Sequence, residues 1–92
     1  MSIQPIRTFK NGKLETERWY DNGGLHREDG PAAIEYYENG YKHREFYVCH
    51  RKLHRLDGPA CIVYDMNGNV VDEEWFLDSY KSFTRVKDAR SI

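Results

Sequence analysis

Hydrophobic residues are concentrated in several short stretches of this chain, in which successive side chains are expected to alternate between two faces. In one of them, Ala60, Ile62 and Tyr64 would point to one face, and Cys61 and Val63 to the other. Such alternation is typical of a β-strand with two different faces. It predicts a mainly all-β protein, an antiparallel meander of about six strands, at residues 3–10, 13–20, 32–38, 41–48, 60–66 and 69–77.

Three Asn-Gly pairs separate neighbouring strands of this prediction. They lie at residues 11–12, 39–40 and 67–68. Asparagine and glycine both tolerate the positive φ that a two-residue type I′ turn requires, so Asn-Gly is a strong hairpin signal. We therefore expect three hairpins, each closed by a two-residue turn.

The chain contains an internal repeat of 28 residues. Residues 25–52 and 53–80 align without a gap, with 12 identical positions. Both copies contain Leu-His-Arg-x-Asp-Gly-Pro-Ala, at residues 25–32 and 53–60. A fixed period indicates that each copy is one supersecondary unit, which buries its hydrophobic residues against the next copy.

The same period extends beyond the two full copies. Trp19, Tyr47 and Trp75 are each 28 residues apart, and we expect them to form one aromatic column. The predicted organisation is a single domain over residues 1–92: a partial repeat at 1–24, full repeats at 25–52 and 53–80, and a C-terminal cap at 78–92.

The repeated motif has a structural interpretation. Glycine permits a tight bend between hairpins, and proline fixes φ where the next strand begins. The aspartate accepts backbone N–H groups or pairs with the arginine two residues earlier, and the histidine bridges to a neighbouring strand. The residues with these expected structural roles are His26, Arg27, Asp29, Gly30 and Pro31, and their counterparts His54, Arg55, Asp57, Gly58 and Pro59.

The C-terminal segment departs from the repeat. Its apolar residues are spaced by three, which favours a short capping helix of about two turns, with Asp78 or Ser79 as the N-cap. Such a helix would cover one face of the predicted sheet. Self-association of the protein through this sheet face is the alternative way to bury it. The residues concerned are Leu77, Tyr80, Phe83 and Val86.

Composition and charge narrow the function classes. With 39% hydrophobic and 14% aromatic residues the chain falls in the globular range, and a net charge of −1 gives no overall attraction to nucleic acid or anionic lipid. No apolar run has the length of a signal sequence or a membrane span, so we expect a cytoplasmic protein without membrane contact. Cys49 and Cys61 are then expected to be reduced thiols.

We expect no catalytic, metal or cofactor site. Cys49, His50, His54 and Cys61 are zinc-ligand types, but their spacing matches no common zinc motif. No nucleophile lies in a recognisable catalytic motif, and the adjacent carboxylates at residues 72–74 point to opposite faces of a strand. The chain is therefore expected not to be an enzyme.

Basic and aromatic residues are the candidates for partner binding. Residues 50–55 form a basic run. In addition, the second face of the predicted sheet combines aromatic and charged residues of the kinds that protein interfaces favour. The alternative role of this second face is to pack under the C-terminal segment. The expected partner-binding residues are Arg51, Lys52, Arg55, Arg18, Tyr20, Phe46, Arg85 and Lys87; Val48 and Phe76 belong to the same face.

The repeated motif, with its flanking Asn-Gly turns and aromatic column, resembles the MORN-variant repeats of bacteriophages, large DNA viruses and some bacteria. The resemblance covers residues 11–77. It implies stacked β-hairpins that present a surface, in a scaffold or interaction module. The chain departs from long arrays of this family because it has only two full copies and a divergent C-terminal segment, which argues against a filament.

The resemblance and the small size suggest a phage-encoded, non-catalytic binding protein. We expect it to occupy a surface of a host protein or ribonucleoprotein complex, such as a CRISPR–Cas effector, and to inhibit that defence complex. Two alternatives remain open: a structural or scaffolding repeat module, and a nucleic-acid-associated protein that uses residues 50–55. A homodimer is compatible with each of them, and no cofactor is expected.

Overall fold

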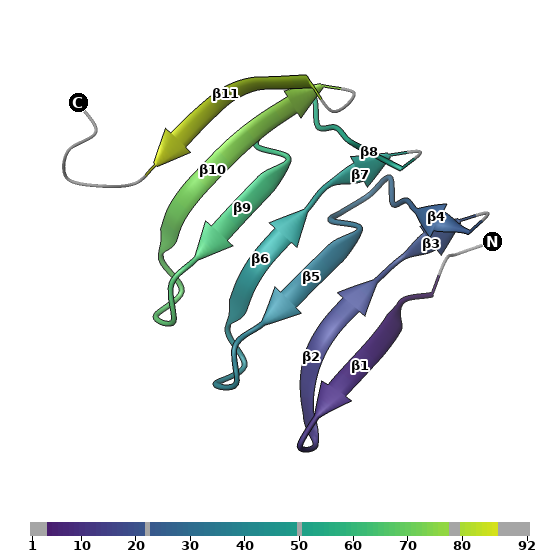
Figure 1. Cartoon of the computed structure of the whole chain (residues 1–92), viewed down its shortest axis with the longest axis vertical. Helices are drawn as coiled ribbons and strands as arrows, with labels where there is room; N and C mark the ends of the chain where they lie inside the picture. Colours follow the sequence, from purple (N-terminus) through teal and green to yellow (C-terminus); the bar gives the residue numbers. More distant parts are fainter. Residues whose placement is uncertain (1–3, 22, 50, 78–79, 87–92) are drawn as a thin grey trace.

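The computed structural model describes residues 4–21, 23–49, 51–77 and 80–86, and this part of the chain contains strands and no helix. Seven strands form one antiparallel sheet in chain order (Figure 1). The predicted all-β antiparallel meander is therefore confirmed. The strands of the sheet are β1 (Ile6–Lys10), β2 (Lys13–Arg18), β5 (Ala33–Tyr36), β6 (Lys42–Phe46), β9 (Cys61–Tyr64), β10 (Val70–Leu77) and β11 (Tyr80–Val86).

Two small hairpins interrupt the meander. The first hairpin pairs β3 (Tyr20–Asp21) with β4 (Gly24–Leu25), and the second hairpin pairs β7 (Val48–Cys49) with β8 (Lys52–Leu53). Each is followed by a connection to the next long strand. We call these connections the first arm, residues 26–32, and the second arm, residues 54–60.

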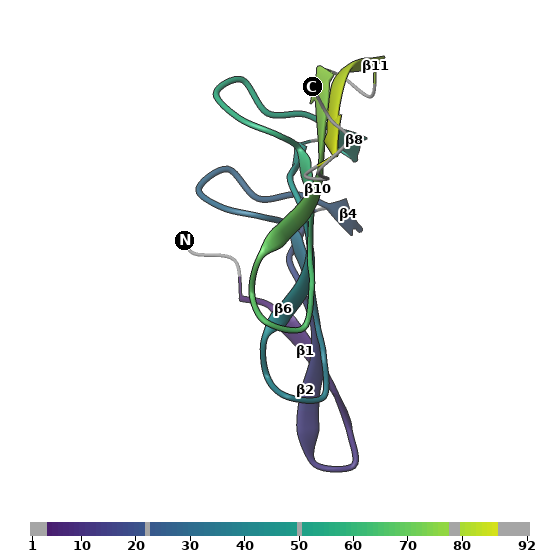
Figure 2. The same cartoon turned by 90° about the vertical axis from the view of Figure 1, so that its left-hand side faces the viewer.

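The hairpins and the arms lie on opposite faces of the sheet. Figure 2 shows the sheet nearly edge-on, with β4 and β8 on one side and the two arms on the other. We call these faces the hairpin side and the arm side. After β2 and again after β6, the chain therefore turns first to the hairpin side and then to the arm side before it returns to the sheet.

The sheet is a single layer. The molecule measures 43 × 33 × 15 Å, and no second layer within the described residues covers either face. The buried apolar side chains consequently form a shallow band along the sheet instead of a closed core. This band consists of Trp19, Ala32, Ala33, Ile34, Val48, Ala60 and Ile62.

The three Asn-Gly turns do not share one geometry. Asn11 (φ 53°) and Gly12 (φ 78°) both have positive φ, as the expected two-residue turn requires. At the other two turns only Gly40 (φ 93°) and Gly68 (φ 89°) have positive φ, and the N–H of Gly40 donates to the C=O of Tyr37 at 3.0 Å. These are longer turns in which a bulge glycine follows a type I turn, so the two-residue expectation is wrong there.

Sequence analysis missed the two small hairpins. Gly23 (φ 80°) and Arg51 (φ 69°) occupy equivalent positions before β4 and β8, and both have positive φ. The dipeptide Asn22-Gly23 is a fourth Asn-Gly pair and carried the signal for the first hairpin. The second hairpin has no such signal, because arginine rarely adopts this conformation.

The C-terminal segment forms a strand where a capping helix was expected. In β11, Tyr80 pairs with Leu77 and Phe83 pairs with Trp75, so the segment extends the sheet at its edge. A spacing of three residues keeps an apolar stripe on a helix for only about two turns, whereas the free edge of β10 offers backbone hydrogen bonds to an extended segment. The proposed N-cap residues 78 and 79 lie outside the described residues.

The third copy of the repeat ends because it lacks an arm. In the first copy the N–H of Trp19 donates to the C=O of Ala32 at 2.8 Å, across the whole of the first arm. In the third copy Trp75 pairs with Phe83 instead, so the chain returns along β10 directly. Asp-Gly-Pro does not recur after residue 80, which agrees with this direct return of the chain.

Candidate binding groove on the hairpin side

The arginine of the repeated motif fixes each arm. The guanidinium of Arg27 lies over the ring of Trp19, 3.9 Å from its centroid. It also contacts Asp29, with Nε 3.1 Å from Oδ1, and donates to the C=O of Pro31 at 3.2 Å. The second arm repeats this arrangement with Arg55 over Tyr47, again at 3.9 Å. The expected pairing of aspartate with arginine is confirmed in both arms.

The glycine of the motif makes room for that arginine. Neither Gly30 nor Gly58 has positive φ. A Cβ at Gly30 would lie 2.9 Å from Cζ of Arg27, and a Cβ at Gly58 would lie 2.9 Å from Cζ of Arg55. Glycine is needed at these positions because the guanidinium approaches the backbone closely, and not because the bend requires an unusual backbone conformation.

The histidines of the motif connect each arm to its strand through the backbone. The N–H of His26 donates to the C=O of Trp19 at 3.0 Å, and the N–H of His54 donates to the C=O of Tyr47 at 3.1 Å. The His26 side chain is buried, with Nε2 3.6 Å from a carboxylate oxygen of Glu28. These contacts agree with a structural role for the motif.

Two glutamates are buried in fixed hydrogen bonds between neighbouring strands. Tyr36 donates its O–H to Oε1 of Glu17 at 2.5 Å, and Arg7 donates to Oε2 at 2.7 Å. Tyr64 donates to Glu45 in the same way, also at 2.5 Å. Each tyrosine therefore joins its own strand to a strand of the preceding copy.

These contacts shift the ionisation of the participating groups. Burial acts to raise the pKa of Glu17, but the hydrogen bonds from Tyr36 and Arg7 outweigh it and hold this pKa below its ordinary value of 4.5. Burial and the glutamate partner raise the pKa of Tyr36 well above 10, and the same causes raise the pKa of Tyr64. Glu17 is thus held as a carboxylate by two donors and serves as a link between strands.

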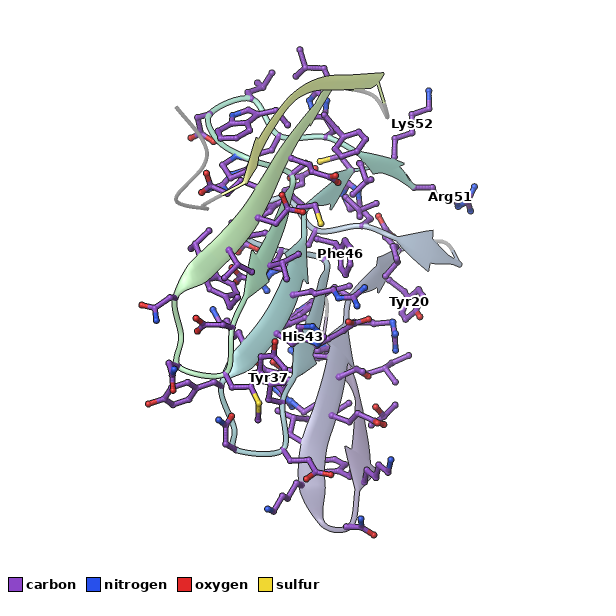
Figure 3. All side chains as sticks on the ribbon, turned by 60° about the vertical axis from the view of Figure 1, so that its left-hand side comes forward. Tyr20, Tyr37, His43, Phe46, Arg51 and Lys52 are labelled. Carbon is purple, nitrogen blue, oxygen red and sulfur yellow. The ribbon has the colours of Figure 1, made fainter. Side chains whose placement is uncertain are left out.

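The basic run at residues 50–55 does not form one patch. Arg51 and Lys52 are exposed on the second hairpin and project from the hairpin side (Figure 3). His54 and Arg55 belong to the second arm, where Arg55 is held against Tyr47. The described residues of the basic run thus lie on both faces of the sheet, because the chain passes from one face to the other within the run.

A groove lies on the hairpin side, between the two small hairpins. It has a volume of about 630 Å³ and is open to solvent along its length. Three of the residues predicted for partner binding, Arg18, Phe46 and Arg51, line it together. Its apolar surface comes from Leu25, Ala33, Phe46, Val48 and Leu53.

The position of Arg51 defines the rim of the groove. Its N–H donates to the C=O of Leu25 at 3.1 Å, which ties the second hairpin to the first. Its side chain lies against Gly24, where an added Cβ would be 2.1 Å from Nε of Arg51. The equivalent positions of the other copies are Lys52 and Tyr80, so glycine is not a general feature of the repeat at this position. Gly24 instead makes room for the side chain of Arg51.

The charge around the groove is positive. Arg18 lies on the same face and donates to Oγ1 of Thr16 at 3.1 Å, a neutral partner. Glu35 also lines the groove, but Nε of Arg44 lies 3.5 Å from its carboxylate. Arg18 and Arg51 are the two cationic residues that line the groove, and Glu35 is the one acidic residue among its lining residues.

Of the other predicted binding residues, those that the structure describes do not line the groove. Tyr20 is exposed on the first hairpin, and Lys52 is exposed on the second. Arg85 is part of β11, and Lys87 lies outside the described residues. Sequence analysis missed Leu25 and Leu53 as groove residues, because the repeat made them look like structural positions of the motif.

A second cleft lies between the two arms, on the arm side. Its volume is about 720 Å³, and Tyr47, Cys49, His54 and Leu56 are among its lining residues. Sγ of Cys49 is 3.9 Å from the C=O of Arg27. No group of three metal-ligating side chains occurs among the described residues, which exclude His50.

The second cysteine is on the hairpin side, beside the acidic residues of β10. Cys61 pairs with Glu74, and Asp72 pairs with the neighbouring Val63. Burial, followed by the charges of Glu74 and Asp72, raises the pKa of Cys61 to about 11. This thiol is therefore protonated at neutral pH and is a poor nucleophile.

Comparisons with known proteins give no relative for this chain. No protein-family model matches it, and neither the curated proteins nor the solved structures give a significant match. Within the described residues, no helix has the length and apolar character needed to cross a membrane.

Proposed function

We propose that this protein is a non-catalytic binding module that docks onto a protein partner through the groove on the hairpin side. The observation that carries the proposal is the convergence of Arg18 from β2, Phe46 from β6 and Arg51 from the turn of the second hairpin on one open groove. Aromatic residues and arginine contribute most often to binding energy at protein interfaces. The N–H of Arg27 donates to the C=O of Val48 and the N–H of Arg51 donates to the C=O of Leu25, both at 3.1 Å, and these bonds support a preformed groove between the hairpins.

We further propose that the protein is a MORN-variant-like repeat protein of phage origin that inhibits a host defence complex, with a CRISPR–Cas effector as the leading candidate. The resemblance of the repeated motif and the small size support this role. A single-layer sheet is a suitable blocking element, since it presents a wide surface at a thickness of 15 Å. The division of the basic run between two faces gives less support to direct nucleic-acid binding.

A capture experiment tests the proposed docking. The full chain, tagged and immobilised, is exposed to bacterial lysate with and without nuclease, alongside the variants Arg18→Glu and Arg51→Asn. We expect one stable protein complex to be captured by the wild type, to survive nuclease treatment and to be lost from both variants. Lys13→Glu is the matched control, because Lys13 is exposed on the hairpin of β1 and β2 and does not line the groove.

Two outcomes contradict the proposal. Capture that is lost after nuclease treatment would favour a nucleic-acid bridge. Capture that both groove variants retain at wild-type level would place docking on another surface. Circular dichroism of each variant verifies that the sheet is intact before either outcome is interpreted.

A further inference from the structure

The chemistry of the groove specifies the kind of partner that it fits, and this inference rests on the proposed function. We infer that the groove receives a short segment of another protein in which an apolar side chain lies next to a carboxylate. The inference follows from three features of the groove: its apolar floor, its positive rim and its size.

The floor of the groove is apolar. Ala33 pairs with Phe46 across β5 and β6, and both face the groove. Leu25 and Leu53 extend the apolar surface onto the two hairpins. Burying an apolar side chain here would remove the exposed part of Phe46 from water, and each Å² of apolar surface so covered contributes to binding.

The rim of the groove selects for negative charge. Arg18 and Arg51 border the floor, and the carboxylate of Glu35 is already paired with Arg44. Guanidinium groups bind carboxylates through charge-assisted hydrogen bonds, often in pairs. A carboxylate beside the buried apolar side chain would therefore satisfy both parts of the groove at once.

The size of the groove favours a peptide segment over a nucleic acid. A volume of about 630 Å³ is in the range of small-ligand sites and accommodates a few side chains. Phe46 is the one aromatic ring among the lining residues, whereas single-stranded nucleic acids are bound by several stacking rings and a track of phosphate contacts.

A peptide titration tests the inference directly. The probe is a terminally blocked hexapeptide that alternates glutamate with leucine, added to the ¹⁵N-labelled full chain. Two matched peptides replace glutamate with glutamine or with lysine. We expect the glutamate peptide to shift the amide signals of Leu25, Phe46 and Leu53, and to bind at least tenfold more tightly than either matched peptide.

Variants of the chain locate the effect at the rim. Arg51→Asn removes the guanidinium and retains a residue that tolerates positive φ, and Gly24→Ala displaces the Arg51 side chain without removing its charge. We expect both to weaken binding of the glutamate peptide at least fivefold, and Lys13→Glu to leave it unchanged. In Arg18→Glu the preference should shift towards the lysine peptide.

The outcomes separate this inference from the proposed function. Equal binding of the three peptides, or no shift at the groove amides at millimolar peptide, overturns the inference; if the groove variants still lose the captured complex, the proposed function stands. A concentration-dependent dimer in sedimentation velocity that Arg18→Glu abolishes would identify a second copy as the occupant, and this also overturns the inference.

Discussion

The guanidinium of Arg27 accounts for most of the repeated motif. It is stacked on Trp19, paired with Asp29 and bonded to the C=O of Pro31, and Gly30 leaves the space in which it lies. A cation over an aromatic ring contributes about 0.5–2 kcal/mol, depending on its exposure. The aspartate, glycine and proline of the motif thus each contact the arginine within the same arm.

Replacement of Gly30 by alanine tests this packing. We expect Gly30→Ala to lower the free energy of unfolding by about 1–3 kcal/mol, because the new Cβ would collide with a guanidinium held on three sides. Urea denaturation gives the measurement. In an Arg27→Ala background the same substitution should cost less than about 0.5 kcal/mol, and an equal cost in both backgrounds would show that the guanidinium is not the obstacle.

The half-buried tyrosines Tyr36 and Tyr64 predict a loss of stability in alkali. The pKa values of Tyr36 and Tyr64 are raised above the ordinary 10.0, so the folded protein retains these protons more strongly than the unfolded chain. Their contribution is complete below pH 10 and decreases as the pH rises above it. We expect the midpoint of urea denaturation to fall as the pH rises above 10, and the double variant Tyr36→Phe, Tyr64→Phe to flatten this dependence. An unchanged slope in the double variant would contradict the assignment.

At the scale of elements, the alternation and the period of the sequence were sufficient to predict the long strands. The predicted strand at residues 41–48 contains β6 (Lys42–Phe46), and the one at residues 69–77 contains β10 (Val70–Leu77). The small hairpins were missed because each strand has only two residues, too few to show alternation. The C-terminal strand was missed because its pairing depends on the free edge of β10, a tertiary feature.

The groove was predictable only in part, for a related reason. Its aromatic and basic residues, Arg18, Phe46 and Arg51, stood out by residue type. Their convergence depends on the second hairpin, which turns at an arginine with positive φ. Residue preferences do not indicate such a turn, so the sequence placed Arg51 in a basic run and not at the rim of a groove.

The different turns lead to a matched prediction. Asn11 has positive φ, whereas Asn67 lies in a turn where only Gly68 does. We expect Asn11→Ala to accelerate amide hydrogen exchange in β1 and β2 by an amount that corresponds to about 1 kcal/mol, because alanine is disfavoured in the left-handed region. Asn67→Ala should change exchange in β9 and β10 by less than about 0.5 kcal/mol. Equal effects at the two turns would mean that they share one geometry.

At the scale of the whole molecule, the two faces of the single-layer sheet carry different features. On the arm side, the stacked arginines and the glutamate–tyrosine pairs join each copy to the next. The hairpin side carries the groove. Substitutions that alter binding and substitutions that alter stability should therefore fall largely on opposite faces, as the variants above are designed to show.

The order of the sheet also limits how copies of the protein join edge to edge. Seven strands alternate in direction from β1 to β11, so the two outermost strands run the same way. A copy added head to tail, with the same face up, would bring these strands together in parallel, against the pattern of the rest of the sheet. Antiparallel pairing with matching faces joins only like edges, β1 to β1 or β11 to β11, so every such contact relates two copies by a two-fold axis.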